Sequence, residues 1–581
     1  MMSLRFIAAV GLVTAGLAAQ DARTVTEPSF PPVCTSLDAQ LSAGPTGLPS
    51  SSETQYDTSR IQNALDSCAS TGQAVELRSS GSNNAFLTAP IRIPPAVTLL
   101  VDAGVTVYAS RNPRDYDANS SQSCGTIAAS GSGCVALINV NRSNGAAIMG
   151  YGVIDGRGYL PLLVNGAPSN ASWWDLADQA NTQKLNQNCP RLLQVNNTNG
   201  FTLYKITLMN SPNFHVSLGT DTNFTAWGVK IIAPYDARNT DGIDPGYSSN
   251  VTITNSHISD GDDNVAVGGG NPPGAMNISV VNNFFGNGHG ASIGSLTQNG
   301  VSNVLFDHIT IAGEAADTNQ NGIRIKSDVS RGGLVQNITY SNFCMRNVRH
   351  PIVFDPFYTS GATGNLIPSY QNIVLNNVHA TTEGLILIEG HDPSVATTIS
   401  LSNVQVDNVK SSDITEEYTT YTLGPDPVNF GSLLKGTGVT VVDNVSTSNP
   451  PLDCPDSIFA PVMGELIPGP AQIESRQALT LAVQVIPTKE ITYRSYLAAL
   501  QSNPAATLAL PRPTGTVTIY DGSSAVGTTT LGDGATTSIP VTIMGAGMHT
   551  LTASYSGDAN YPAFTFGSYN VSATNHRLPR R

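Results

Sequence analysis

Charged side chains are scarce in this 581-residue sequence, since Asp, Glu, Lys and Arg together make up 12% of it, about half the share usual in soluble domains. A coiled coil needs abundant Ala, Glu, Lys and Leu, and is therefore excluded. Intrinsic disorder is excluded as well, because 40% hydrophobic and 7% aromatic residues can fill a large core. The sequence is instead rich in Asn, Ser, Thr, Gly, Val and Ile, which favours strands and turns.

Cations are the scarcer of the two charged classes: 28 Lys and Arg stand against 42 Asp and Glu, for a formal charge of −14. Nucleic acid is therefore not expected as a partner, because phosphate binding needs a dense cationic surface. A polyanionic substrate would require local cations that outweigh this global charge.

Long hydrophobic runs are absent too, and no segment reaches the roughly 18 apolar residues of a membrane-spanning helix. Residues 1–19 contain Arg5, a short apolar stretch and then small residues, which predicts a secretory signal peptide; a buried N-terminal helix is the alternative. We therefore expect a secreted, extracellular protein, or one exported to the periplasm or cell surface.

Cysteine is rare, and none of the seven cysteines stands in the closely spaced pairs of a metal cluster. In an exported protein, seven cysteines suggest disulfides with one thiol left over. The first pairings to expect are Cys34 with Cys68 and Cys124 with Cys134. The sequence does not assign the one further bridge that three cysteines could hold: Cys189, Cys344 and Cys454.

One short phrase recurs along the chain, an Asn followed by alternating β-forming residues. It begins at six positions, in steps of 26–35 residues: Asn223, Asn250, Asn277, Asn303, Asn337 and Asn372. This period predicts one solenoid coil per repeat, with Val and Ile stacked inward and Asn laddered at the turns. We therefore predict an all-β protein whose residues 29–465 form a right-handed parallel β-helix, a single-stranded solenoid.

Residues 57–69 carry the clearest helix signal. Asp57 is the expected N-cap, and one helical face is apolar: Ile61, Ala64, Leu65 and Cys68. A helix here would cover the end of the solenoid, which is otherwise an exposed sheet edge.

The sequence pattern changes near residue 465. Pro468 and Pro470 mark a linker, and short alternating strands follow, with a turn signal at Asp521-Gly522. Residues 466–575, linker included, resemble bacterial immunoglobulin-like modules. We expect a small β-sandwich that can be removed without loss of turnover, although the stretch 493–501 fits a sandwich poorly. Residues 576–581 form a basic tail.

Four short motifs follow one another at about one coil's spacing: Asn239-Thr-Asp241, Gly261-Asp-Asp263, Gly288-His-Gly290 and Arg324-Ile-Lys326. On a solenoid they would place three carboxylates, an imidazole and two cations in a line down one face. Arg324 and Lys326 point the same way on a strand. Asp262 and Asp263 reach one side only if the backbone bends, which Gly261 permits.

Each motif alone has an ordinary structural explanation. The segment 260–264 is acidic like a calcium loop, but the twelfth position from Asp260 is Asn271 rather than the Glu of an EF-hand. The shared spacing of the four motifs favours a functional site, and we expect it to need neither a metal nor a cofactor.

In this order the four motifs resemble the signature of glycoside hydrolase family 28, the polygalacturonases. Three other segments resemble the family as well: 152–156, 211–215 and 355–358, the last with Pro356 where the family often has Gln. The resemblance covers about residues 30–460. It implies hydrolysis, without a metal, of the α-1,4 linkages of polygalacturonate and pectin, with inversion of the anomeric configuration.

The resemblance also implies roles for single residues. Asp262 is the expected general acid, Asp241 and Asp263 hold the attacking water, and His289 supports the acid. The expected substrate contacts are Arg324 and Lys326, which would bind the sugar carboxylate, together with Asn239 and Tyr358. Paired carboxyls suit inversion, because one protonates the leaving oxygen while another activates water about 6.5–9.5 Å away.

The alternatives are a rhamnogalacturonan or xylogalacturonan hydrolase, a pectate lyase and a non-catalytic β-helix adhesin. The sequence leaves open whether the enzyme acts within chains or at their ends. Loops around 120–134 and 159–188 could close one end of the cleft, with Trp173 and Trp174 either stacked on sugar or packed in the core. A monomer is expected.

Overall fold

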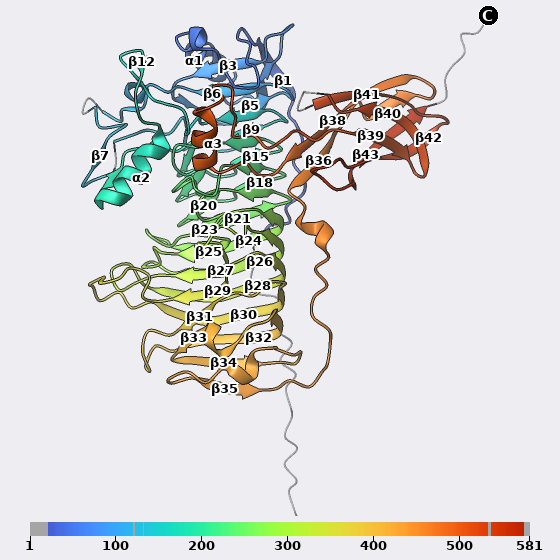
Figure 1. Cartoon of the computed structure of the whole chain (residues 1–581). Coiled ribbons are helices and arrows are strands. Elements are labelled where there is room, and N and C mark those ends of the chain that lie inside the picture. The colour runs from blue at the N-terminus through green and yellow to red at the C-terminus, as the bar shows by residue number, and fades with distance from the viewer. Residues whose placement is uncertain (1–20, 120–121, 132, 533–535, 575–581) are drawn as a thin grey trace, which may run out of the picture.

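The computed structural model of the chain describes residues 21–119, 122–131, 133–532 and 536–574. The predicted signal peptide (1–19) and basic tail (576–581) lie outside these residues. The described chain forms a long parallel β-helix and a smaller β-sandwich, which projects sideways from the N-terminal half of the β-helix (Figure 1). None of the described helices is both long and apolar enough to cross a membrane.

One face of the β-helix is a regular sheet of eleven parallel strands, one from each coil. In chain order these are β4 (Ile91–Arg92), β8 (Ile138–Asn141), β14 (Leu193–Asn196), β17 (Val216–Gly219), β20 (Ile243–Gly246), β23 (Val265–Val267), β25 (Ala291–Gly294), β27 (Asn321–Lys326), β29 (His350–Asp355), β31 (Ile386–Glu389) and β33 (Ile414–Glu417). Neighbours in this sheet are consecutive coils, which confirms the predicted parallel β-helix.

The remaining faces form a second, twenty-stranded sheet made of two ladders. The first ladder contains β1 (Val33–Asp38), β2 (Gln73–Arg78), β5 (Val97–Val101), β9 (Ala147–Met149), β15 (Thr202–Tyr204), β18 (Thr225–Trp227) and β21 (Ser249–Thr254). The second contains β3 (Ala85–Thr88), β6 (Thr106–Ala109), β10 (Val153–Asp155), β16 (Thr207–Met209), β19 (Lys230–Ile232) and β22 (His257–Ser259). Both ladders pair with β24 (Ala275–Phe285). From there one strand per coil continues: β26 (Val301–Ala312), β28 (Leu334–Arg346), β30 (Ser369–Ala380), β32 (Thr397–Val406), β34 (Thr419–Leu423) and β35 (Thr440–Asp443).

The repeated asparagines form the predicted ladder. Asn250, Asn277, Asn303, Asn337 and Asn372 have φ between +53° and +58°, a conformation that Asn tolerates better than most residues. From Asn277 onward, the side-chain amide of each donates to the amide oxygen of the one a coil earlier, over 2.7–3.4 Å. Asparagine thus both adopts the left-handed backbone conformation that each turn needs and forms a hydrogen bond to the same turn of the neighbouring coil.

Helix α1 (Thr58–Ser67) covers the N-terminal end of the solenoid and buries Ile61, Ala64 and Leu65, as predicted. Asp57 is the N-cap residue of α1, as predicted, but its side chain makes no capping hydrogen bond. That carboxylate instead accepts hydrogen bonds from Arg60 and from the backbone N–H of Leu87, and so ties the start of α1 to β3.

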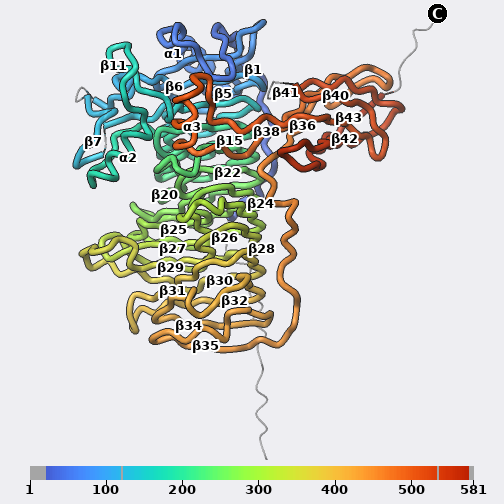
Figure 2. Tube along the Cα trace, in the orientation of Figure 1, coloured from blue at the N-terminus to red at the C-terminus, as the bar shows by residue number. Residues whose placement is uncertain are grey.

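Three disulfides link the described cysteines. Cys34–Cys68 and Cys124–Cys134 confirm the two expected pairings. The third, Cys344–Cys454, fastens to β28 the segment that runs back along the β-helix after β35 (Figure 2). Cys189 keeps a free thiol.

Two further helices were not predicted. Helix α2 (Trp173–Gln183) lies in the loop region 159–188 beside β13 (Asn186–Gln187), which pairs with β7 (Ile127–Ala128); β11 (Leu163–Val164) pairs with β12 (Ala167–Pro168) nearby. Trp173 and Trp174 are 0% and 1% exposed, so they belong to the packing rather than to a sugar-stacking surface. Helix α3 (Tyr493–Leu500) occupies the stretch that fits a sandwich poorly.

The C-terminal sandwich has two sheets. One contains β36 (Val462–Ile467), β38 (Ala478–Pro487) and β41 (Thr536–Thr542); the other contains β37 (Gln472–Glu474), β43 (Phe564–Thr574), β42 (Gly547–Tyr555), β39 (Thr516–Asp521) and β40 (Ser524–Thr530). The sandwich thus includes residues from 462 onward. Residues 488–515, here called the insert, leave the sandwich between β38 and β39 and carry α3.

The sandwich packs against the β-helix, and its separability stays a prediction. Glu465 on β36 lies between Lys230 on β19 and Lys205, with 2.8 Å to the latter. The side chain of Lys230 is 2% exposed. The amide of Gln484 on β38 donates to the carbonyl of Tyr151 over 3.2 Å. Two prolines at 468 and 470 therefore do not mark a loose tether.

Candidate active site

The four predicted motifs meet at four consecutive strands of the eleven-stranded sheet. Three motifs directly precede β20, β23 and β25, and the fourth lies within β27. The strands are in register, since Ile243 pairs with Val265, Val265 with Ala291, and Ala291 with Ile323. Register of this kind turns spacings of one coil in the sequence into neighbouring positions about 4.8 Å apart on the sheet.

A bend at Gly261 lets the carboxylates of both Asp262 and Asp263 face His289. A Cβ at this position would lie 2.1 Å from the carbonyl oxygen of Ala237, so no larger residue fits. Asp260 and Asp262 hold the bend, because their carboxylates accept from the backbone N–H of Asp262 (3.0 Å) and Asp263 (3.1 Å). The expected bend is therefore present.

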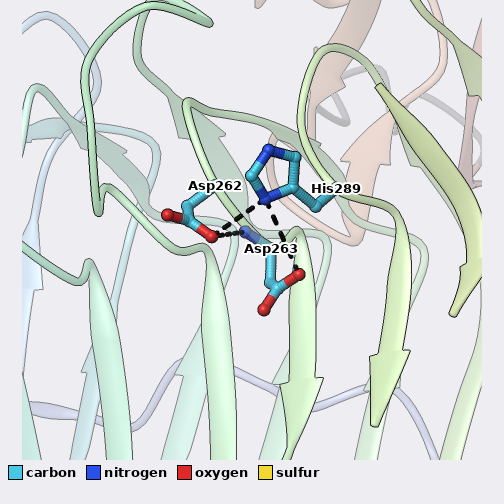
Figure 3. Close-up of side chains that lie close together, drawn as sticks. All are labelled: Asp262, Asp263 and His289. Atoms are coloured by element: carbon cyan, nitrogen blue, oxygen red, sulfur yellow. Dashed lines mark hydrogen bonds and ion pairs between the residues drawn. The ribbon is translucent and has the colours of Figure 1, made fainter. Parts of the chain in front are cut away.

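His289 contacts the predicted acid directly. Its Nδ1 lies 3.0 Å from Oδ1 of Asp262 and 4.0 Å from Oδ1 of Asp263 (Figure 3). The amide of Asn239 donates to the other oxygen of Asp262 over 3.1 Å. Both oxygens of Asp262 thus have partners that fix the orientation of the carboxyl.

Asp263 is surrounded by cations. Its Oδ2 lies 2.7 Å from Nζ of Lys326, and its Oδ1 accepts from Nη1 of Arg324 (3.3 Å) and from the hydroxyl of Ser292 (2.7 Å). The ring of Tyr358 stands over both cations, 5.4 Å from the guanidinium carbon and 5.1 Å from the ammonium. The two residues expected to bind a sugar carboxylate are therefore also the partners of Asp263.

Asp241 is 6% exposed, and its Oδ1 is buried without a hydrogen-bond partner among the described residues. Its turn is supported from beneath by His215, whose N–H donates to the Asp241 carbonyl over 2.8 Å and whose Nδ1 lies 3.0 Å from the carbonyl of Thr240. Burial lowers the pKa of His215 to about 4, so this ring is a neutral support.

The carboxyl groups differ in their affinity for protons. Burial raises the pKa of Asp241 well above its ordinary value, and the charges of Asp262 and Asp244 raise it further. Burial acts the same way on Asp262, but His289, Lys326 and Arg324 outweigh it and lower its pKa. In the absence of substrate, a proton in the cluster therefore belongs to Asp241 rather than to Asp262.

Asp262, Asp263 and His289 also bring potential metal ligands together, with atoms within 4.8 Å of one another. Lys326 and Arg324 already lie against Asp263, and a cation there would have to displace them. The prediction of a metal-independent site remains a prediction that a chelator can test.

A cavity of about 780 Å³, here called the groove, continues from Asn239 toward the N-terminal coils. Helix α2 forms one wall, and Asn139 on β8 and Gln194 on β14 lie on the other. Three cationic side chains line it: Lys184, Arg191 and Arg238. The groove therefore offers positive charge beside the carboxylate cluster in an otherwise acidic protein.

Several residues of the site were not predicted. Asp244 lies on β20, just after the turn that carries Asp241, and its buried Oδ1 has no hydrogen-bond partner among the described residues. The hydroxyl of Ser292 donates to Asp263. The amide of Gln187 donates to Asn239 over 2.8 Å. Strand alternation after Asp241 would have placed Asp244 on the outer face, opposite the inward Ile243. Gln187 had no such signal, because the short strand β13 that carries it lies outside the repeat.

A parallel β-helix that carries paired carboxylates, an imidazole and cations on one sheet defines a carbohydrate-cleaving enzyme of the acid/base type. Residues 91–423 match Glycosyl hydrolases family 28, and the chain belongs to this family. It is a glycoside hydrolase. Residues 469–574 match the bacterial Ig-like domain (group 3).

The relatives carry consistent names. The chain is 42% identical over 399 residues to an endo-polygalacturonase of Pectobacterium carotovorum subsp. carotovorum, which covers 68% of this chain and 92% of that protein. It is 39% identical over 501 residues to a polygalacturonase of Ralstonia nicotianae, covering 75% and 92%. Among solved structures, it is similar to a polygalacturonase from Erwinia carotovora ssp. carotovora, with a TM-score of 0.58, 36% identity and coverage of 75% of this chain and 99% of that one.

Proposed function

We propose that this protein is a polygalacturonase that hydrolyses the α-1,4 linkages of polygalacturonate with inversion. The observation that carries the proposal is the cluster of Asp241, Asp262 and Asp263 on adjacent coils, with Lys326 and Arg324 beside it. Two carboxyl groups can divide acid and base roles, and two cations suit a sugar that carries a carboxylate. The names of the relatives support the same substrate.

In the proposed mechanism, Asp262 protonates the leaving oxygen, and Asp241 and Asp263 hold the attacking water. In the free site a proton belongs to Asp241 rather than to Asp262. Substrate binding must therefore move the proton to Asp262 before it can act as the acid. A uronate carboxylate at Arg324 and Lys326 adds negative charge and partly neutralises these cations, so it raises the proton affinity of Asp262. His289, in contact with Asp262, is placed to pass it a proton. Asn239 and Tyr358 orient the sugar.

The groove extends the proposal to longer substrates. Lys184, Arg191 and Arg238 provide cations where further uronate units would lie, and charge-assisted hydrogen bonds to carboxylates are stronger than neutral ones. We therefore infer cleavage within chains rather than at chain ends, in line with the relative named an endo-polygalacturonase.

The first experiment is the time course of products from polygalacturonate. A spread of oligomers in the first minutes is expected, with no ultraviolet absorbance from unsaturated uronides and with full activity in excess chelator. Proton NMR should show a new reducing end of opposite anomeric configuration. Monomer alone from the start would overturn internal cleavage. Unsaturated products with calcium-dependent activity would mean a lyase.

We further propose that the enzyme is secreted and monomeric. The sequence of residues 1–19 and the three disulfides support export. Detection of the mature protein in culture medium, and its mass by light scattering, test the two statements separately.

A further inference from the structure

Helix α2 is the wall of the groove that does not belong to the β-helix. Ala177, Ala180 and Asn181 of α2 line the groove, so a displacement of this helix would change its width. The helix is short, and short helices take most of their stability from packing. What packs against α2 on its other side therefore bears on substrate binding.

The insert of the C-terminal module provides that packing. The hydroxyl of Tyr493 in α3 lies 2.9 Å from Oγ of Ser172 and donates to Oδ2 of Asp175 over 3.1 Å. Ser172 and Asp175 form the capping box at the start of α2. One hydroxyl from the C-terminal module thus bonds both members of the N-terminal cap of the groove helix.

Aromatic rings make the same connection. The ring of Tyr493 meets Trp174 edge-on at 5.2 Å, and Tyr496 meets Tyr159 edge-on at 5.4 Å. Trp174 is 1% exposed, and its Nε1 donates to the carbonyl of Ser211 in the β-helix. These contacts form a buried apolar cluster of residues from α2, α3 and the β-helix.

The N-terminus of α3 is fixed to the β-helix close to the catalytic turn. The carboxylate of Asp236 accepts from the N–H groups of Tyr493 (2.6 Å) and Arg494 (3.0 Å). Asp236 lies three residues before Asn239, which borders the groove. An ion pair between Lys489 and Glu314 holds the start of the insert. Helix α3 is therefore clamped between the catalytic sheet and α2.

We propose that the insert is a positioning element of the enzyme: α3 holds α2 at the distance from the sheet that a long polyuronate chain requires. The C-terminal module thereby contributes to binding of long substrates without touching them. This inference rests on the proposed polygalacturonase function, because it assigns the groove to uronate units beyond the cleaved bond.

The test compares Tyr493→Phe and Tyr493→Ala with the wild-type full-length protein. Loss of the hydroxyl removes two hydrogen bonds, so Tyr493→Phe should raise KM for polygalacturonate about 2- to 10-fold. Tyr493→Ala should raise it further. For the shortest oligomer that the wild type cleaves, kcat should stay within about twofold, since the catalytic carboxylates are untouched.

Tyr569→Phe is the matched control, because its hydroxyl donates to the carbonyl of Pro470 inside the sandwich. It should leave both constants unchanged. Hydrogen exchange of the α2 amides provides a readout that is independent of activity, and exchange should be faster in Tyr493→Phe than in Tyr569→Phe.

Unchanged exchange in α2 together with an unchanged KM for polymer would overturn the positioning role, even if Tyr493→Ala failed to fold. A parallel loss of kcat on polymer and short oligomer would also overturn it, because that pattern means general damage. A wild-type protein inactive on every galacturonan would refute the proposed function instead, while the exchange measurement would still decide whether α3 braces α2.

Discussion

Asp262 and Asp241 divide the acid and base roles in the proposed reaction, and their replacements test the division. Asp262→Asn should lower kcat on polygalacturonate by about 10²–10⁴-fold, the usual contribution of a positioned general acid. A leaving group that needs no proton, such as nitrophenol on an oligogalacturonide, should restore much of the rate. Asp241→Asn should be equally slow on both substrates. Rescue of Asp241→Asn instead would make Asp241 the acid, as the pKa directions of the free site suggest.

Lys326 is expected to have two roles that different substrates separate. Lys326→Met leaves the buried Asp263 without its 2.7 Å partner and removes one contact to the sugar carboxylate. Charge-assisted hydrogen bonds contribute about 1.5–3 kcal/mol, so kcat/KM on polygalacturonate should fall about 10- to 100-fold. The loss on fully methyl-esterified pectin should be smaller. Equal losses would leave Lys326 with only its role beside Asp263.

At the residue scale, the sequence located the site well but not its internal contacts. Motif spacing was enough to place Asp262 and His289 together, because coils stack in register. The pairing of Lys326 and Arg324 with Asp263 depends on how far the two long side chains reach across two coils. The alternation of side chains along a strand predicts the face they point to but not this reach. Gln187 on β13 and the α2 wall of the groove lie outside the repeated coils, so no sequence period predicts their neighbours.

At the element scale, the asparagine turns were predictable because each coil needs a residue with positive φ at the same position, and Asn adopts that conformation readily. The same logic yields a stability prediction. Asn303 has φ +58° and is bonded to Asn277 and Asn337. Asn303→Ala should cost about 2–3 kcal/mol, from left-handed strain and lost ladder bonds. Asn303→Gly keeps the backbone conformation and should cost less. Calorimetric melting of the two variants makes the comparison, and equal losses would show that the turn conformation contributes little.

Helices α2 and α3 could not be predicted in the same way. Neither belongs to the repeat, and both depend on contacts between segments more than 300 residues apart, such as Ser172 with Tyr493. The apolar face of α1 gave a clear signal because that helix covers a regular solenoid end. The local signals were present, since α2 begins with a capping box at Ser172 and Asp175 and Thr492 caps α3, but they stand outside the repeat on which the prediction rested.

At the scale of the whole molecule, the docked sandwich brings two buried carboxyls together. Glu490 in the insert and Asp155 on β10 are 8% and 9% exposed, and burial raises the pKa of both, that of Asp155 to about 6. Arg157 only partly offsets this for Asp155. A raised folded-state pKa for an acid means that stability is highest below the unfolded pKa and falls as pH rises through the folded value.

The contribution of this carboxyl pair to thermal stability should therefore decrease between about pH 4.5 and pH 7, so the slope of Tm against pH should be more positive in Glu490→Gln than in wild type. At pH 7 the Tm of Glu490→Gln should exceed that of wild type by about 1 °C per kcal/mol, the scale expected for a chain of this length. Glu383→Gln, in an exposed pair with Lys410, should leave the slope unchanged. Melting curves over this pH range decide the matter. A slope that is the same in wild type and Glu490→Gln would show that Glu490 does not titrate between its folded and unfolded states in this range.

Glu465 and Lys230 form a buried ion pair between the modules, and removing one partner should destabilise the whole chain. With Lys230 2% and Glu465 9% exposed, Glu465→Ala leaves a buried ammonium with no carboxylate partner, a loss of about 3–5 kcal/mol. The exposed pair of Arg78 and Asp38 is the control, since both side chains are half exposed and Asp38→Ala should cost at most about 1 kcal/mol. Replacing both members, Lys230→Met with Glu465→Leu, should recover most of the stability, because well-packed apolar groups can substitute for a buried ion pair.

A chain ending near residue 465 would lose α3 and expose Trp174, so it should melt earlier than Glu465→Ala. If Glu465→Ala and Asp38→Ala melt alike by calorimetry, the sandwich does not depend on this ion pair for its place on the β-helix, and the module would again be expected to be separable.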